Sequence, residues 1–110
     1  MDEGFIHDLF APFGEVRTRR MFGGVGVYRD GVMFALAADG ELYLKSDAES
    51  AERFRAAGSQ PFEYEQRGRK VALSYWRLPE EALDDPAELE QWARLAYQAA
   101  LKARPTGKRR

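Results

Sequence analysis

Apolar residues at the start of the chain recur at three- and four-residue spacing, as on one face of an α-helix. The positions are Phe5, Ile6, Leu9, Phe10 and Phe13. Pro12 and Gly14 then interrupt the pattern, and both residues favour the end of a helix. We therefore predict a short amphipathic helix that ends near Phe13.

A second helical pattern lies near the end of the chain. Its shared apolar face consists of Leu89, Trp92, Ala93, Ala96 and Ala100. Before this face, Asp85 is suited to the N-cap, Pro86 to the first helical position and Glu88 to the third, which resembles a capping box. The alanines permit a close approach of this helix to a sheet, and the pattern fades near Ala103.

Two Asp-Gly pairs, Asp30-Gly31 and Asp39-Gly40, separate three short apolar runs. Such a pair indicates a tight hairpin turn, because type I′ turns need positive φ at both central positions. The runs at residues 25–28, 32–38 and 41–45 therefore predict an antiparallel meander of three strands. Residues 15–20 make it four if they join the sheet.

The middle of the chain predicts one more helix and a second hairpin. Asp47 is a good N-cap for a surface helix through about Ala57, and Gly58 is a good stop. Apolar and polar residues then alternate over 62–65 and 71–76. Together these elements predict an α+β fold, in which an antiparallel sheet of five to six strands is flanked by N-terminal, middle and C-terminal helices.

The amino-acid composition limits the size, location and chemistry of the protein. The 110 residues, 45% hydrophobic and 32% charged, are typical of one soluble globular domain, which we assign to residues 1–104 with a basic flexible tail at 105–110. No apolar run or secretory signal suggests a membrane or exported protein, so we expect a cytoplasmic location. The absence of cysteine and the single histidine, His7, exclude thiolate chemistry and multi-histidine metal sites. We expect no catalytic residue, metal or cofactor, and we expect His7 on the solvent side of the first helix.

The segment Gly23-Gly24-Val25-Gly26 is unusually rich in glycine for a strand. Glycine-rich backbone binds phosphate in some folds, but this segment lacks the spacing of those motifs and a strand follows it rather than a helix. We interpret it as a bulge or a tight entry into the strand. Likewise, the acidic pairs Glu80-Glu81 and Asp84-Asp85 are explained as capping and helix-dipole partners.

Charge is distributed unevenly along the chain. Overall the net charge is −1, but the last nine residues carry five cations and no acid, which leaves −6 on the remainder. Possible nucleic-acid contacts are Arg17, Arg19, Arg20, Arg69, Lys70, Lys102, Arg104, Lys108, Arg109 and Arg110. The first five form one basic patch if the two hairpin regions are neighbours, and Tyr28, Tyr75 and Trp76 are candidate stacking surfaces for bases. The alternatives are ordinary solvated charge, core aromatics and a tail that only aids solubility.

Six local patterns, in order along most of the chain, carry a resemblance to a known family. They are Met21-Phe22-Gly23-Gly24, Phe34-Ala35-Leu36, Leu42-Tyr43-Leu44-Lys45, Pro61-Phe62-Glu63-Tyr64, Ser74-Tyr75-Trp76-Arg77-Leu78-Pro79 and the helix with Trp92-Ala93. The chain is identified as a member of the TfoX/Sxy family of bacterial competence regulators and resembles a stand-alone TfoX N-terminal domain, without the second domain of full-length members. The resemblance implies helices flanking an antiparallel sheet, similar to the secretion-chaperone-like architecture.

The resemblance also implies a regulatory role in place of an enzymatic one. We expect a protein-interaction domain that regulates the transcription of competence (DNA transformation) genes through a protein partner, as a monomer or homodimer, with no membrane contact. The alternative is an accessory protein that binds DNA weakly and without sequence preference through its basic tail.

Overall fold

The computed structural model describes residues 2–21 and 23–103. For residues 64–66 and 69–73 it describes the backbone only. The fold is of the α+β class, with one antiparallel sheet and flanking helices. In chain order the elements are α1 (Glu3–Phe10), β1 (Arg17–Met21), β2 (Gly24–Arg29), β3 (Val32–Ala38), β4 (Glu41–Lys45), α2 (Ala48–Ala56), β5 (Pro61–Gln66), β6 (Arg69–Arg77), α3 (Glu81–Asp84) and α4 (Pro86–Ala103).

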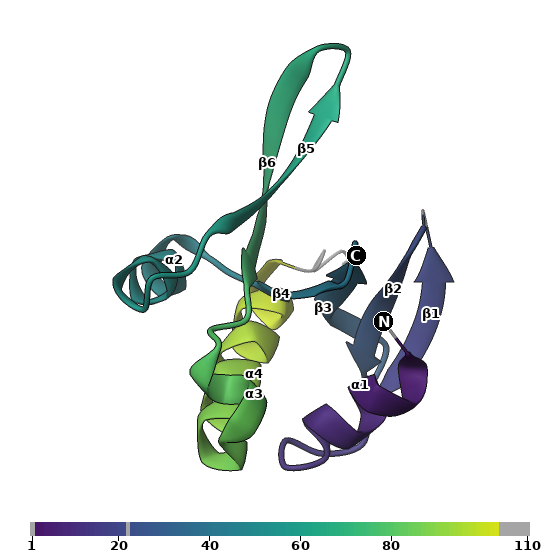
Figure 1. Ribbon diagram of the computed structural model, residues 1–110. Helices are drawn as coiled ribbons and strands as arrows, with labels where there is room; N and C mark the ends of the chain where they lie inside the picture. Colours follow the sequence, from purple (N-terminus) through teal and green to yellow (C-terminus); the bar gives the residue numbers. More distant parts are fainter. Residues whose placement is uncertain (1, 22, 104–110) are drawn as a thin grey trace, which may run out of the picture.

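The six strands form one antiparallel sheet in the order β1-β2-β3-β4-β6-β5. Helices α1, α3 and α4 lie on one side of this sheet, and the β5–β6 hairpin projects away from the body on the other (Figure 1). Both the predicted fold class and the fourth strand of the meander are confirmed.

The turns of the meander have the predicted chemistry. Asp30 and Gly31 have φ of 50° and 79°, and Asp39 and Gly40 have φ of 52° and 77°. Positive φ at two successive residues is the requirement of the type I′ turn that gives a tight two-residue hairpin. The two Asp-Gly pairs therefore determine where the chain reverses direction between β2 and β3 and between β3 and β4.

Side-chain caps begin helices α2 and α4. Asp85 Oδ1 accepts hydrogen bonds from the backbone N–H of Ala87 and of Glu88, at 3.0 and 3.3 Å, which confirms the predicted start of α4. Asp47 and Ser50 exchange bonds at the start of α2, where Ser50 N–H donates to Asp47 Oδ1 and Asp47 N–H to Ser50 Oγ. The reciprocal pair is a capping box.

Two helical features differ from the sequence-based expectation. Helix α1 ends at Phe10 rather than near Phe13, because the chain closes there in a tighter turn with Phe13 N–H bonded to the Phe10 carbonyl at 2.9 Å. Helix α3 was not predicted. Its single turn buries only Ala82, and Glu80 at its N-cap makes no capping hydrogen bond. The sequence therefore has neither an apolar periodicity nor a capping residue that would predict this helix.

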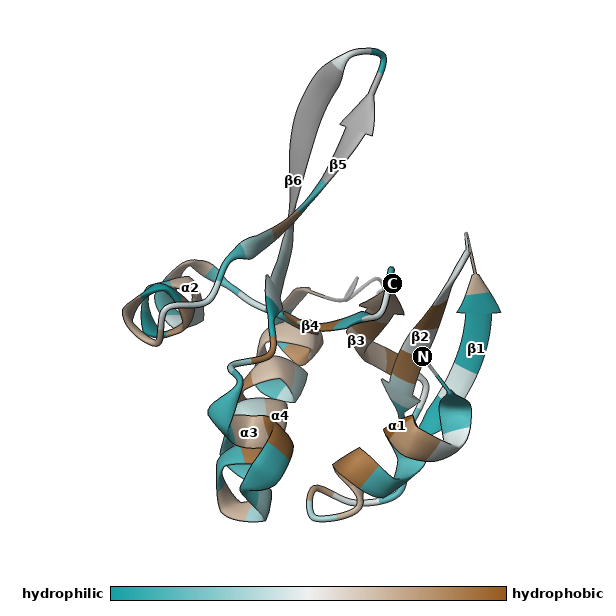
Figure 2. Ribbon diagram, in the orientation of Figure 1, coloured by the Kyte–Doolittle hydropathy of each residue, from teal (hydrophilic) through white to brown (hydrophobic). Residues whose placement is uncertain are grey.

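The core lies between the inner face of the sheet and the helices. Val27, Ala35 and Leu44 form one row across β2, β3 and β4, and each side chain is fully buried. Alanines of α4, including Ala93 and Ala96, are also fully buried and allow the helix to approach this row closely. Figure 2 shows hydrophobic residues concentrated in β2, β3, α1 and α4, whereas β1 is mostly hydrophilic.

A bulge between β2 and β3 adds a large side chain to this core. Val27 lies opposite Ala35, but Tyr28 lies opposite Met33, so Phe34 is an extra residue on β3. Phe34 is fully buried, and its ring lies 5.3 Å from that of Phe10 in an edge-on arrangement. The bulge thus places consecutive residues Phe34 and Ala35 in the core.

Candidate functional site

The side of the sheet that faces away from α1, α3 and α4 carries half-buried aromatic and apolar residues together with cations. We call it the open face, because no helix of the described chain covers it (Figure 1). Side chains alternate across a strand, so it is formed by the neighbours of the buried residues. Its members are Arg17, Arg19, Met21, Tyr28, Met33, Leu36, Glu41, Tyr43, Lys45, Tyr75 and Arg77.

Glycine at position 26 shows that the central residues of the open face are neighbours. A Cβ at Gly26 would lie 2.9 Å from Met21 Cε, 3.1 Å from Tyr28 Cε1 and 3.2 Å from Met33 Sδ. These three side chains therefore converge over the backbone of β2. Gly26 also lies opposite Arg19 in the β1–β2 ladder, which places Arg19 beside the same apolar centre.

Aromatic residues continue the open face across β4 and β6. The ring of Tyr43 packs edge-on against Phe62, with centroids 4.7 Å apart. Lys45 Nζ lies 5.3 Å from the ring centroid of Tyr75 and donates a hydrogen bond to Ser74 Oγ. Burial raises the pKa of the Tyr75 phenol, and the nearby Tyr28 raises it further. The Tyr75 phenol therefore stays protonated at physiological pH, with the Lys45 ammonium as the charge beside it.

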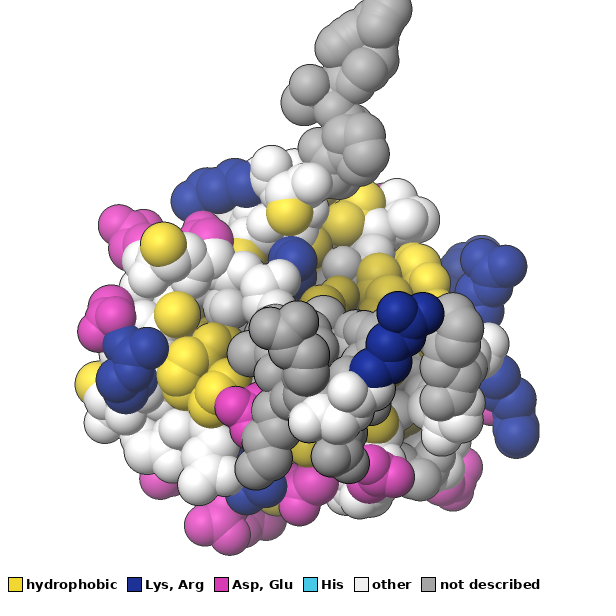
Figure 3. Space-filling view, turned by 90° about the horizontal axis from the view of Figure 1, so that it is seen from above, with side chains coloured by type: hydrophobic (Ala, Val, Ile, Leu, Met, Phe, Trp, Pro, Cys, Tyr) yellow, Lys and Arg dark blue, Asp and Glu magenta, His cyan; other side chains and the backbone are white. Residues whose placement is uncertain are grey.

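Tyr28 and Tyr75 also line a hollow of about 430 Å³ at one end of the open face. Asp30, Met33 and Lys45 contribute to its wall, and Ala100 and Ala103 line it from the end of α4. Figure 3 views the molecule from the side opposite helices α1, α3 and α4. It shows hydrophobic side chains gathered beside Lys and Arg side chains.

Charge separates between the two sides of the sheet. Strands β1 to β4 contain five arginines and lysines but a single acid, Glu41, which pairs with Arg77 at 3.5 Å. Two of the five point toward the helices. Arg20 Nε lies 3.5 Å from Glu3 Oε2, and the Arg29 guanidinium lies 4.4 Å from the ring centroid of Phe13.

The remaining acids belong mostly to the helical side. Carboxylates on α1, α3, α4 and the residues that begin them are Asp2, Glu3, Asp8, Glu80, Glu81, Asp84, Asp85, Glu88 and Glu90. The net charge of −1 therefore conceals a basic sheet face and an acidic helical side.

The structure divides the sequence-predicted nucleic-acid contacts. Arg17 and Arg19 lie on the open face, and strand order places three strands between β1 and β6. The side chains of Arg69 and Lys70, and all of Arg104, Lys108, Arg109 and Arg110, lie outside the described residues. Lys102 is described, and its Nζ lies 3.3 Å from Asp47 Oδ2.

Trp76 corrects one expectation for the aromatic residues. It faces the core, is 8% exposed and stacks on Phe54 with ring centroids 6.1 Å apart. It is therefore not a surface for stacking bases. Sequence reasoning overlooked Tyr43, Lys45 and Arg77, although the alternation of buried Leu42 and Leu44 with Tyr43 and Lys45 was a signal for a second, exposed face.

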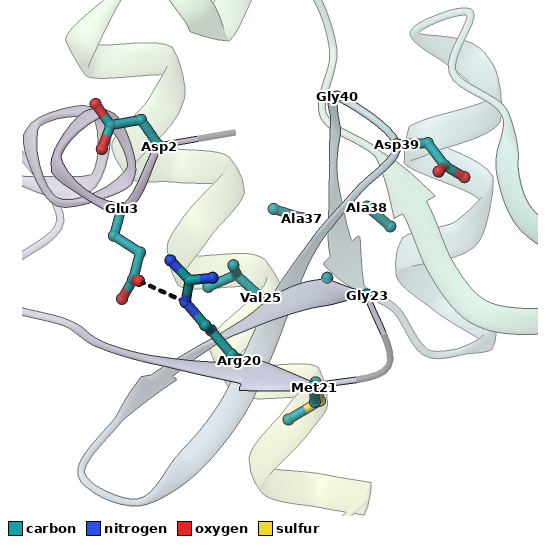
Figure 4. A pocket seen from close by; sticks show the side chains of 11 residues that line it. Asp2, Glu3, Arg20, Met21, Gly23, Val25, Ala37, Ala38, Asp39 and Gly40 are labelled. Carbon is teal, nitrogen blue, oxygen red and sulfur yellow. Dashed lines mark ion pairs between the residues drawn. The ribbon is translucent and has the colours of Figure 1, made fainter.

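The glycine segment lines a separate cleft of about 630 Å³ between the start of α1 and two hairpin turns. Figure 4 shows the Glu3–Arg20 pair on one side and Met21, Gly23 and Gly40 toward the turns. Phe22 lies outside the described residues. A Cβ at Gly24 would lie 2.5 Å from the Ala37 carbonyl oxygen, so close backbone packing requires this glycine. The interpretation as a tight strand entry is confirmed.

The carboxylates of Asp2 and Glu3 at the cleft have partners on α1 and β1. Asp2 Oδ1 accepts from Gly4 N–H at 2.9 Å, and Glu3 also accepts a hydrogen bond from Thr18 Oγ1. His7 is exposed on α1. Among the side chains that the structure describes, no three His, Asp or Glu residues are placed to share a metal ion, and no described helix is long and apolar enough to cross a membrane.

Comparison with known proteins agrees with the sequence resemblance. The TfoX N-terminal domain model matches residues 8–100. Protein Sxy of Escherichia coli K12 is 30% identical over 99 residues, and DNA transformation protein TfoX1 of Aliivibrio fischeri is 33% identical over 89 residues. The alignments cover 90% and 81% of this chain but only 47% and 42% of those relatives, so the chain spans less than half of their length. The chain belongs to the TfoX N-terminal domain family.

Proposed function

We propose that this chain is a non-catalytic regulatory domain that controls the transcription of DNA transformation genes through a protein partner. The observation that carries the proposal is the family match over residues 8–100, together with a relative whose name assigns it to DNA transformation. Because the chain spans less than half of the relatives, their role is transferred as a proposal for this domain alone.

Residues on the helical side support the proposal of a protein partner. Leu83 on α3 is 47% exposed, which is high for a large apolar residue. Four exposed carboxylates flank it along the chain, at Glu80, Glu81, Asp84 and Asp85. Leu83 with these four carboxylates is complementary to a partner surface that is apolar at its centre and basic at its margin.

The cleft beside the glycine segment supports a structural role for its polar residues. Asp2 caps α1, and Glu3 joins α1 to β1 through Thr18 and Arg20. Carboxylates held in this way position two elements against each other. Their arrangement is explained without a bound substrate.

A genetic experiment tests the proposal in the bacterium that encodes the chain. The gene is deleted and then complemented, and both transformation frequency and transcript levels of the DNA-uptake genes are measured. We expect both to fall on deletion and to recover with the wild-type chain. If deletion changes neither under conditions where the bacterium takes up DNA, the regulatory proposal is wrong.

A matched pair of leucine variants then tests the partner surface. Leu83→Glu adds charge to the surface formed by Leu83 and the four carboxylates and is expected to prevent complementation while the thermal unfolding temperature stays near that of the wild type. Leu101→Glu is the control, because Leu101 is 38% exposed near the end of α4, outside that surface. Equal complementation by both variants contradicts a partner on α3.

A further inference from the structure

We propose that the open face binds single-stranded nucleic acid, with Arg17, Arg19, Lys45 and Arg77 contacting phosphates and the tyrosines stacking against bases. This goes beyond the proposed function, which concerns a protein partner on the helical side. Three features of the open face lead to this ligand: its charge, its aromatic residues and the place of Lys45 in the sheet.

The charge of the open face favours an anionic ligand. Arg17 and Arg19 are exposed on β1, and Arg77 is 44% exposed on β6. Glu41 is the single carboxylate on β1 to β4, and the carboxylates of α1, α3 and α4 lie on the other side of the sheet. Asp30 in the β2–β3 turn also lines the hollow beside Tyr28, but the four cations Arg17, Arg19, Lys45 and Arg77 outnumber Glu41 and Asp30, so a polyanion that approaches from the sheet side meets a net positive surface.

The aromatic residues favour a single strand over a duplex. Tyr28 and Tyr75 line one hollow, and Tyr43 packs with Phe62 further along the same face. Bases of a single strand stack on such rings whatever their sequence, while a duplex keeps its bases stacked inside. Only a single strand therefore uses both the cations and the rings of the open face.

The position of Lys45 argues against an ordinary protein interface. Lys45 is on β4, an interior strand of the sheet, and its ammonium group lies 5.3 Å from the Tyr75 ring centroid. Charged residues, lysine among them, are depleted at the centre of protein interfaces. A cation set among tyrosines is instead the combination that proteins use to hold phosphate and base together.

Fluorescence anisotropy of the full chain with labelled strands tests the proposal. The probes are an oligothymidine of about 20 nucleotides, longer than a typical single-strand site, its oligouridine equivalent, and a mixed-sequence duplex of the same length. We expect either single strand to bind at least about tenfold more tightly than the duplex, with a salt slope near −3 for four phosphate contacts.

A double charge reversal locates the site. Arg17→Glu/Arg19→Glu is expected to weaken single-strand binding by at least about tenfold at about 50 mM salt, because two phosphate contacts are lost. Arg53→Glu/Arg94→Glu is the matched control, since both arginines are exposed on α2 and α4 and the change in net charge is identical. All three chains keep the same C-terminal cations, so any contribution of the tail cancels in the comparison.

A ring removal separates stacking from charge. Tyr28→Leu keeps an apolar side chain in the strand, and it is expected to weaken single-strand binding by about fivefold or more with duplex binding unchanged. Thermal unfolding of each variant is measured to check that the fold is retained.

Three outcomes overturn the proposal. The first is an affinity for the duplex equal to that for the single strand. The second is an equal loss of single-strand affinity in both charge-reversal variants. Either result indicates non-specific electrostatic attraction and no defined binding site. The third is no binding of any strand at low salt. If the Arg17→Glu/Arg19→Glu chain then still fails to complement the deletion strain, the open face docks a protein instead. Failure of this proposal leaves the deletion experiment unaffected, so the two are distinguishable.

Discussion

Tyr28 lies opposite Met33 in the β2–β3 ladder, although Val27 just before it lies opposite Ala35. The extra residue, Phe34, turns into the core. Tyr28 and Met33 thereby come together on the open face, where both approach Gly26. One bulge therefore supplies an aromatic anchor to the core and part of the candidate binding surface at the same time.

The first prediction concerns the anchor at Phe34. Phe34→Ala removes a fully buried ring that packs against Phe10, Phe13 and Tyr97. We expect a loss of about 3–5 kcal/mol in the free energy of unfolding, measured by denaturant titration. Leu36→Ala on the open face is the control and should cost clearly less, because its side chain is only half-buried. Similar losses would mean that Phe34 is not the anchor.

The second prediction separates two glycines of β2. Gly24→Ala brings a Cβ to 2.5 Å from the Ala37 carbonyl oxygen, where only backbone movement gives relief. We expect a destabilisation of about 1–3 kcal/mol. Gly26→Ala meets the flexible ends of Met21 and Met33 and the edge of the Tyr28 ring, which are side chains rather than backbone, and should cost less. The reverse order of unfolding temperatures would contradict the close β2–β3 packing at Gly24.

The sequence predicted the elements better than their faces. Turn pairs such as Asp39-Gly40 and the cap at Asp85 are local, and their chemistry is readable from neighbouring residues. The bulge at Phe34 is not readable in this way, because alternation alone would place Phe34 and Ala35 on opposite sides. The inward orientation of Trp76 follows from its pairing with Leu44, a contact between distant parts of the chain.

The candidate site was predicted only in part for the same reason. Arg17 and Arg19 were identified as possible contacts from their clustering in sequence. Strand order places three strands between β1 and β6, and it brings Lys45 and Tyr75 together on one face. Strand order depends on long-range pairing, which no local pattern specifies.

The third prediction concerns the cap of α2. Asp47→Ala removes the acceptor of the Ser50 N–H bond and should lower the free energy of unfolding by about 1 kcal/mol at neutral pH. The pKa of Asp47 lies below its usual value of 3.8, chiefly because of the hydrogen bond from the Ser50 backbone N–H, with help from the Ser50 hydroxyl and Lys102.

That lowered pKa gives the prediction its pH dependence. Asp47 contributes stability that is present above about 3.8 and is lost as the pH falls through the folded-state pKa. The difference between wild type and Asp47→Ala should therefore shrink in acid, as measured by urea titrations across this range. A difference that is constant from neutral to acidic pH would show that the carboxylate charge has no part in the cap.

The fourth prediction concerns alkaline unfolding. The pKa of Tyr75 is raised above 10.0 in the folded chain by burial and then by Tyr28. A raised pKa stabilises the folded state below the unfolded-state value and loses that contribution as the pH rises through the folded-state value. Tyr75→Phe should therefore be less sensitive than the wild type to pH above about 10. Identical alkaline profiles would contradict the burial of the Tyr75 hydroxyl.

The central claim is that the open face is the surface that meets single-stranded nucleic acid, and the most direct measurement is an NMR titration of the ¹⁵N-labelled full chain with an oligothymidine. We expect the amide signals of β1, β2 and β4 around Arg19, Tyr28 and Lys45 to shift first and most. The signals of α3 and the first turns of α4 should stay in place. Shifts centred on the helical side, or confined to the C-terminal residues, would contradict the account.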